Sequence, residues 1–138
     1  MYLTRLMYVS ELTPGVDIDV PQILESARRN NAKAEVTGAL WFGSNLFIQV
    51  LEGGRRAVSS TYHKIAADSR HGNIELVECR VVSERIFHKW TMGYHADTGE
   101  NRSRVLRYSG HNELIPREMS PESLLGFLSD LNLSDKHY

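Results

Sequence analysis

Four polar side chains stand where a packed core would normally hold apolar groups. Tyr8 and Gln49 lie in alternating segments that are typical of strands, and Asn30 and Asn31 lie at the end of an apolar helical stripe. All four can point into the space between a sheet and its helices, where an apolar core cannot satisfy a phenol and three carboxamides. A flat heteroaromatic ligand with ring amides and carbonyls would satisfy all four. We therefore expect them to line a ligand site.

The same residues also have purely structural interpretations, which stay open at this point. Asparagine is common near helix C-termini, so Asn30 and Asn31 can be ordinary end-of-helix residues. A buried glutamine such as Gln49 often satisfies backbone groups. Lys64 and Asp68 are four residues apart on a predicted helix, a spacing typical of a surface ion pair worth about 0.2–0.5 kcal/mol.

The alternation and the helical spacing of apolar residues predict the elements that position this set. Strands are predicted over 3–10, 36–42, 46–51, 75–82 and 90–95, and helices over 21–31 and 56–67. The segment 46–51 is apolar on both faces, with Phe47, Gln49 and Leu51 sharing one, so we expect a central strand. Two right-handed crossovers place both helices on the same face of the sheet. The fold class is α/β (α+β): a ferredoxin-like sandwich in the order β-α-β-β-α-β-β, with a mixed five-stranded sheet.

The tail differs in character from residues 1–95, and we expect residues 96–138 to form a C-terminal helical extension. The charged stretch 100–108 favours a helix, and Ser120 and Pro121 are typical of a capped helix start. That last helix has more apolar residues than a free helix would carry: Leu124, Leu125, Phe127, Leu128 and Leu131. We expect it to cover the bare face of the sheet or to make an oligomer contact.

Composition excludes several classes of protein. A chain of 138 residues with a net charge of -1 has no basic face for nucleic acid. No apolar run approaches the roughly 20 residues that span a bilayer, no signal peptide is recognisable, and the single cysteine, Cys79, favours a reducing compartment. We therefore expect a cytoplasmic protein with no membrane partner.

Enzymatic chemistry is not supported by the residues. The six histidines show no metal-ligand spacing, so no metal site is predicted. Gly53 and Gly54 follow a strand but lack the Lys-Ser/Thr of a phosphate-binding loop, and no catalytic triad can be assembled.

A set of motifs spread over residues 1–95 nevertheless resembles one family. The motifs are Tyr8, Asn30-Asn31, Thr37-Gly38, Phe47-x-Gln49-x-Leu51-Glu52-Gly53, Asp68-x-Arg70-His71 and Phe87-x-x-Trp90-x-Met92. In combination they resemble the BLUF domain, a blue-light sensor using FAD. The tail, with Arg107-Tyr108-Ser109-Gly110 and Met119-Ser120-Pro121-Glu122-Ser123, further resembles the short, stand-alone PixD-type members.

The resemblance implies a role for each matching residue. Tyr8 would give an electron to the excited flavin, and Gln49 would bridge Tyr8 and the flavin edge. Asn31, assisted by Asn30, would bind the polar edge of the pyrimidine ring, while Ile23 would pack on the ring. The remaining cofactor-binding residues, toward the other ring edge and the ribityl phosphate side, would be Lys64, Asp68, Arg70 and His71.

Two further residues belong to the photoactive set that the resemblance implies. Trp90 and Met92, which the alternation places on one face of the last strand, would compete for the position next to Gln49. One departure from the family concerns Ala27, where many members carry a serine that supports the glutamine network. The departure would affect the lifetime of the signalling state rather than flavin binding.

The function implied by the resemblance is a non-enzymatic blue-light photoreceptor with a non-covalently bound flavin, FAD or else FMN or riboflavin. Light-driven electron and proton transfer from Tyr8 would rearrange the hydrogen bonds of Gln49 and red-shift the flavin spectrum. The signal would pass through protein–protein contacts, in a ring-like homo-oligomer with a response-regulator-like partner. The alternative is a non-photoactive ligand-binding domain or oligomeric adaptor of the same fold. The colour of the purified protein separates the two.

Overall fold

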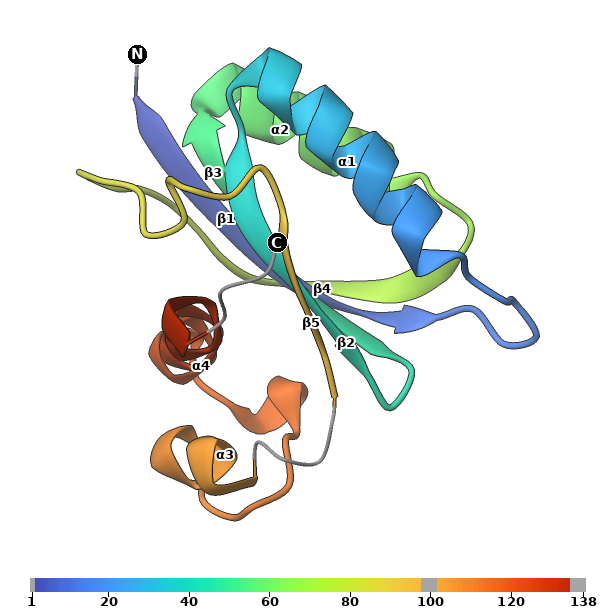
Figure 1. Cartoon of the computed structure of the whole chain (residues 1–138), viewed down its shortest axis with the longest axis vertical. Coiled ribbons are helices and arrows are strands. Elements are labelled where there is room, and N and C mark those ends of the chain that lie inside the picture. The colour runs from blue at the N-terminus through green and yellow to red at the C-terminus, as the bar shows by residue number, and fades with distance from the viewer. Residues whose placement is uncertain (1, 98–101, 135–138) are drawn as a thin grey trace.

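A computed structural model describes residues 2–97 and 102–134 of the chain (Figure 1). The elements are β1 (Leu3–Leu12), α1 (Val20–Ala34), β2 (Thr37–Gly43), β3 (Leu46–Gly54), α2 (Arg55–Ala66), β4 (His71–Val81), β5 (Gly93–Ala96), α3 (Arg102–Tyr108), a 3-10 turn (Pro116–Glu118) and α4 (Pro121–Ser134). The strands form one mixed sheet in the order β4-β1-β3-β2-β5.

The sheet topology confirms the ferredoxin-like expectation. Strands β1, β3, β2 and β4 pair antiparallel, and β5 is added at the edge, parallel to β2. Helices α1 and α2 lie on one face of the sheet, and α4 lies on the other (Figure 1). The β2–β3 hairpin closes through Ser44 and Asn45, whose φ angles of 50° and 60° fit a two-residue turn that follows the twist of the strands.

Strand β3 is central, as its sequence predicted, and its side chains serve two separate cores. Phe47 and Leu51 pack toward the helices in a core that includes Leu6 and Tyr8 of β1. The alternating residues face the other way, so Ile48 packs in the second core toward α4. Gln49 is on the helix side, in register with Tyr8 across the β1–β3 pair.

Helix α1 extends further than the sequence indicated. Asp19 caps its N-terminus by accepting from the Gln22 amide at 3.1 Å. The helix ends at Ala34, where Glu35 takes the left-handed conformation with a φ of 57°. Asn31 therefore lies in the last turn of α1 and Asn30 just before it, and the Asn31 carbonyl accepts from the Val36 amide at 2.9 Å, so the end-of-helix interpretation of the two residues stays open.

Two strand boundaries also differ from the expectation. β4 begins at His71, four residues before the predicted start at residue 75. β5 begins only at Gly93, so Trp90 and Met92 precede it in an irregular connection. The prediction that they share one face of a strand was wrong: Trp90 packs against the α4-side core and Met92 lies in the helix-side core. The alternation does not hold there because the backbone is not extended.

The face of the sheet opposite α1 and α2 is covered by the tail. Leu124, Phe127, Leu128 and Leu131 of α4 are all buried, and they pack in one core with Met7, Val9, Ile48 and Val50 of the sheet. The first residues of the predicted 100–108 helix lie outside the described part of the chain.

Candidate functional site

A cavity of about 230 Å³ lies between the sheet and helices α1 and α2. It is lined by Tyr8, Ile18, Ile23, Ser26, Ala27, Asn30, Leu40, Phe47, Gln49, Lys64, Ile65, Asp68, Arg70, His71 and Met92. Most of the side chains proposed from the sequence are thus brought together, from β1, α1, β3, α2, the start of β4 and the segment before β5. The walls are mainly apolar, and a few polar groups converge on them, which is typical of a small-molecule site.

The central contact of the cavity joins Tyr8 and Gln49. The two residues face each other across the β1–β3 pair, and the Tyr8 hydroxyl donates a hydrogen bond to Gln49 Oε1. Burial raises the pKa of the Tyr8 phenol far above its ordinary value, and the nearby Tyr62 and Asp68 add to the rise. The phenol is therefore a protonated donor at any physiological pH, and Gln49 is held with its oxygen toward it.

The other end of the Gln49 amide has a weaker partner. Its Nε2 lies 3.6 Å from Met92 Sδ, and a thioether is a poor acceptor. Gln49 is only 6% exposed and lines the cavity, so a ligand in the cavity can reach its amide. An amide with one strong and one weak partner loses little on its weak side when it is turned over, so its orientation changes when the strong partner stops donating and becomes an acceptor. The arrangement can therefore switch.

One end of the cavity carries charged groups. Arg70 Nε donates to both oxygens of Asp68 at 3.0 Å, and this hydrogen bonding lowers the pKa of the Asp68 carboxyl. Lys64 lines the cavity on the same side, but the ion pair of Asp68 is with Arg70 rather than with Lys64. Lys64 and Arg70 outnumber the one carboxylate, Asp68, so this end carries a net positive charge and suits an anionic group.

His71 stands between the charged end and the Tyr8 ring. Its Nε2 donates to the carbonyl of Ile65 at 2.6 Å, so its Nδ1, 2.7 Å from Ser10 Oγ, can accept from that hydroxyl. Its ring also lies 6.1 Å from that of Tyr8, centroid to centroid. These bonds fix the imidazole as part of the wall.

The two asparagines have different surroundings. Asn30 is exposed and lines the cavity. Asn31 is buried, does not line the cavity, and donates through Nδ2 to the carbonyl of Thr91 at 2.7 Å. Trp90 is also outside the cavity, packed against the α4-side core. Of the two competing residues, Met92 is the one beside Gln49.

Several lining residues were not proposed from the sequence. Phe47 is two residues from Gln49 on β3, so the alternation of the strand places both on one face. Ile65 belongs to the apolar stripe of α2, so the helical spacing could have identified it. Ser26 and Ile18 had no such signal, because α1 and the loop before it are placed by tertiary packing. Ala27, expected to replace a serine, does line the cavity.

A larger cavity, of about 820 Å³, lies on the opposite side of the sheet, between residues that include Trp41, Leu114 and Phe127. Its lining does not include Tyr8, Asn30, Asn31 or Gln49. Within the described ranges no group of three or more His, Cys, Asp or Glu side chains could hold a metal ion, and no helix there is long and apolar enough to cross a membrane.

Comparison with known families gives a match over residues 3–93 to the BLUF model, described as sensors of blue-light using FAD. The photoactivated adenylate cyclase subunit beta of Euglena gracilis is 37% identical over 92 residues, 65% of this chain and 11% of that protein. The blue light- and temperature-regulated antirepressor BluF of Escherichia coli (strain K12) is 34% identical over 88 residues, 63% of this chain and 22% of that protein. The chain therefore spans less than a quarter of these relatives.

Solved structures match nearly the whole chain. The structure described as the BlsA photo-activated state has a TM-score of 0.88 and 28% identity, and the match covers 99% of each chain. The dark-state structure of BlrB, described as a BLUF protein, has a TM-score of 0.77 and 26% identity, covering 97% of this chain and 98% of that one. The similarity thus includes the tail helices as well as the sheet.

Proposed function

Since this chain belongs to the BLUF family of blue-light sensors that use FAD, we propose that it detects blue light through the Tyr8–Gln49 hydrogen bond at its flavin site. The observation that carries the proposal is the arrangement of Gln49 at the cavity, with its oxygen bonded to a buried phenol and its nitrogen bonded to a thioether, which is a weak acceptor. The alternative, a non-photoactive ligand-binding or adaptor domain, gives no reason for such an arrangement.

The residues of the cavity fit a flavin. Ile23, Phe47 and Ile65 supply apolar walls for the faces of a planar ring system, and Asn30 supplies a carboxamide for its polar edge. Arg70 and Lys64 suit the phosphates of FAD or FMN. The cavity is smaller than the roughly 300–1,000 Å³ of complete ligand sites, so it would enclose the ring, and the phosphate-bearing tail would leave at the charged end, where the Arg70 side chain is 44% exposed.

The bound flavin supplies an electron acceptor that becomes strong when it absorbs blue light. Tyr8 would supply the electron, its phenolic proton has a path to Gln49 Oε1, to which the hydroxyl already donates a hydrogen bond, and both would return to Tyr8 when the charges recombine. Once that bond is disturbed, the amide can settle with its donor and acceptor exchanged. The Met92 thioether would then face a different atom of Gln49, so the local change is passed to the backbone of the segment before β5.

The output is proposed to run from Met92 through β5 to the tail. His95 of β5 is buried and shares a hydrogen bond between its Nε2 and Asn132 Oδ1 of α4. A shift of β5 would therefore reach α4 directly. We propose that the receiver is another protein, with a response-regulator-like partner and a ring-like homo-oligomer as specific forms, and that the protein acts in the cytoplasm, where a single exposed cysteine is compatible with a reducing medium.

The first prediction tests the photoreceptor function directly. The purified protein should be yellow, and its flavin absorption should move to longer wavelength under blue light and return in darkness. Absorption spectroscopy before, during and after illumination measures this. A protein that takes up no flavin on reconstitution, or whose spectrum does not respond to light, would leave only the alternative function.

The second prediction concerns which flavin binds. Arg70→Gln should weaken binding of FAD and FMN about tenfold, because a charge-assisted hydrogen bond to phosphate is lost. Riboflavin has no phosphate, so its affinity should stay unchanged. Fluorescence titration of the apoprotein with the three flavins measures this. Arg29, an exposed α1 residue, offers the control Arg29→Gln, which should bind all three as the wild type does. Equal losses for riboflavin and FAD would contradict a phosphate role for Arg70.

A further inference from the structure

The connection between β4 and β5, residues 82–92, carries Met92 to Gln49 although it contains no helix or strand. Its position is set by contacts with neighbouring elements. The end that enters the cavity is held by backbone carbonyls: Gly38 N donates to the carbonyl of Trp90 at 3.0 Å, and Arg28 Nε donates to that of Met92 at 3.0 Å. A second set of contacts holds the beginning of the connection.

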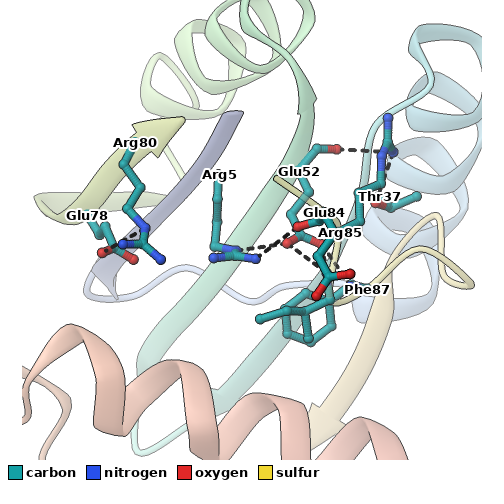
Figure 2. Close-up of polar contacts among 9 residues, drawn as sticks. Arg5, Thr37, Glu52, Glu78, Arg80, Glu84, Arg85 and Phe87 are labelled. Carbon is teal, nitrogen blue, oxygen red and sulfur yellow. Dashed lines mark hydrogen bonds and ion pairs between the residues drawn. The ribbon is translucent and has the colours of Figure 1, made fainter. Parts of the chain in front are cut away.

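That second set centres on Glu52 of β3 (Figure 2). The Glu52 side chain is fully buried, and its carboxylate accepts from the backbone amides of Ile86 at 3.0 Å and Phe87 at 2.7 Å. A carboxylate that binds consecutive amides makes charge-assisted bonds, which are stronger than neutral ones. Phe87 is itself fully buried, so the chain is fixed at this point.

The charge of Glu52 is balanced by Arg5 of β1. The two residues lie directly opposite each other in the β1–β3 register, and Arg5 Nε is 2.8 Å from Glu52 Oε2. Arg5 is only 4% exposed, and its Nη2 also donates to the carbonyl of Glu84 at 3.4 Å. Both members of the ion pair thus bind the same short stretch of the connection.

Arg85 extends this attachment toward α1 (Figure 2). Its Nη2 donates to the carbonyl of Glu35, the residue after α1, at 2.8 Å, and its Nη1 donates to Thr37 Oγ1 at 3.1 Å. The beginning of the connection is therefore tied to β1, β3, β2 and the end of α1 together.

The location of the ion pair relates it to the photoactive residues. Glu52 follows Gln49 by three residues on the same central strand, and the two side chains point to opposite faces of the sheet. Gln49 contacts the end of the connection, and Glu52 binds its beginning. Since β3 is paired on both sides, the distance between these two attachments is fixed.

We propose that the Arg5–Glu52 pair is a positioning device that holds Met92 against Gln49 in the dark state and so sets the rate of dark recovery. The inference rests on the proposed photoreceptor function. Stability alone is a weak reason for such a pair, because a buried ion pair often adds little stability relative to apolar residues, and its best-attested use is to fix a register. Because the beginning of the connection is anchored, light displaces only the end that carries Met92. In darkness Met92 then returns to a single position against Gln49, which keeps dark recovery fast.

The test compares Glu52→Gln with Glu78→Gln. Glu78 pairs with Arg80 at 3.5 Å on the neighbouring strand β4, away from the connection, and is the matched control (Figure 2). Glu52→Gln should keep flavin and the red shift but recover in darkness about threefold more slowly, a change of about 0.65 kcal/mol in the barrier. In the flavin-free protein the amides of Ile86 and Phe87 should exchange hydrogen faster. Glu78→Gln should match the wild type in both measurements.

Further variants separate positioning from general destabilisation. Val105→Ala removes core volume from α3 on the same side of the sheet and leaves the hydrogen bonds of Glu52 and Arg5 to the connection in place, so it should lower the melting temperature while leaving dark recovery unchanged. Arg5→Lys keeps a cation beside Glu52 and should slow recovery less than Glu52→Gln, so it serves as the test if Glu52→Gln does not fold.

The outcomes for the two proposals differ. Wild-type recovery and wild-type amide exchange in Glu52→Gln, or in a folded Arg5→Met variant, would overturn the positioning role while leaving the photoreceptor function intact. Slowed recovery in Val105→Ala equal to that in Glu52→Gln would also overturn it. A wild-type protein with no light response would refute the photoreceptor function. It would also refute the proposal that the Arg5–Glu52 pair sets the rate of dark recovery.

Discussion

Replacing Gln49 by leucine leaves flavin bound and abolishes the light-induced red shift. Leucine fills a similar volume in the cavity wall, so the apolar contacts with the flavin ring system remain. It has no donor or acceptor to exchange, so the hydrogen-bond pattern around the flavin cannot change. The Tyr8 hydroxyl loses its acceptor, which lowers the free energy of unfolding by about 1–3 kcal/mol. Difference spectra in darkness and under blue light measure the effect.

The chain contains one other glutamine, which provides a control of the same chemistry. Gln22 is exposed on the first turn of α1, and only its backbone amide takes part in the cap. Gln22→Leu should therefore retain the full red shift and its recovery. In the described structure Gln49 is the carboxamide that accepts a hydrogen bond from Tyr8, so no other glutamine or asparagine there could replace it. A normal photocycle in Gln49→Leu would therefore show that Gln49 has no part in the mechanism.

Tyr8→Phe should also bind flavin and lose the native photoreaction. The ring keeps its place in the helix-side core, while the hydroxyl bonded to Gln49 Oε1 is removed. Phenylalanine is much harder to oxidise than tyrosine and has no proton to pass on, so both parts of the light-driven step fail. Time-resolved absorption after a blue flash should show no red-shifted product. Formation of that product at the wild-type yield would contradict the role of Tyr8.

Tyr62 allows the same substitution beside the site. Its ring centroid lies 5.9 Å from that of Tyr8, but its hydroxyl is not bonded to Gln49 in the described structure. Tyr62→Phe should retain the red-shifted product. Loss of the product in this variant as well would show that the effect follows from disturbed packing near the cavity rather than from the Tyr8 hydroxyl.

The parts of the fold that follow from local patterns could be predicted from the sequence. Strand β3 is apolar on both faces because it is paired on both sides, and period two alone places Gln49 with Phe47 and Leu51. Tyr8 and Gln49 were both predicted to face the helices, and they do. Their direct pairing needed the register of β1 on β3, which the residue pattern of either strand alone does not contain.

The conformation of the connection before β5 could not be predicted from the alternation of its residues. Trp90 and Met92 alternate as strand residues would, yet they face different cores because the backbone there is bound by Gly38, Asn31 and Arg28. Each of these partners is at least 50 residues away in sequence, as is Arg5 from Glu84. A side chain that caps a distant carbonyl leaves no periodic signal. For the same reason Asn31 could not be told from a cavity residue by sequence.

Gly38 packs so closely against β3 that this position, at the edge of the site, accepts no other amino acid without a shift of the backbone. A Cβ at position 38 would stand 2.0 Å from the carbonyl oxygen of Val50, so any side chain would push β2 away from β3. That carbonyl belongs to the residue after Gln49, and the amide of Gly38 binds the carbonyl of Trp90. A Gly38→Ala variant would therefore be expected to spoil the colour response without altering any group that touches flavin. For anyone building a light-controlled tool from this chain, position 38 is one to leave out of a mutagenesis library.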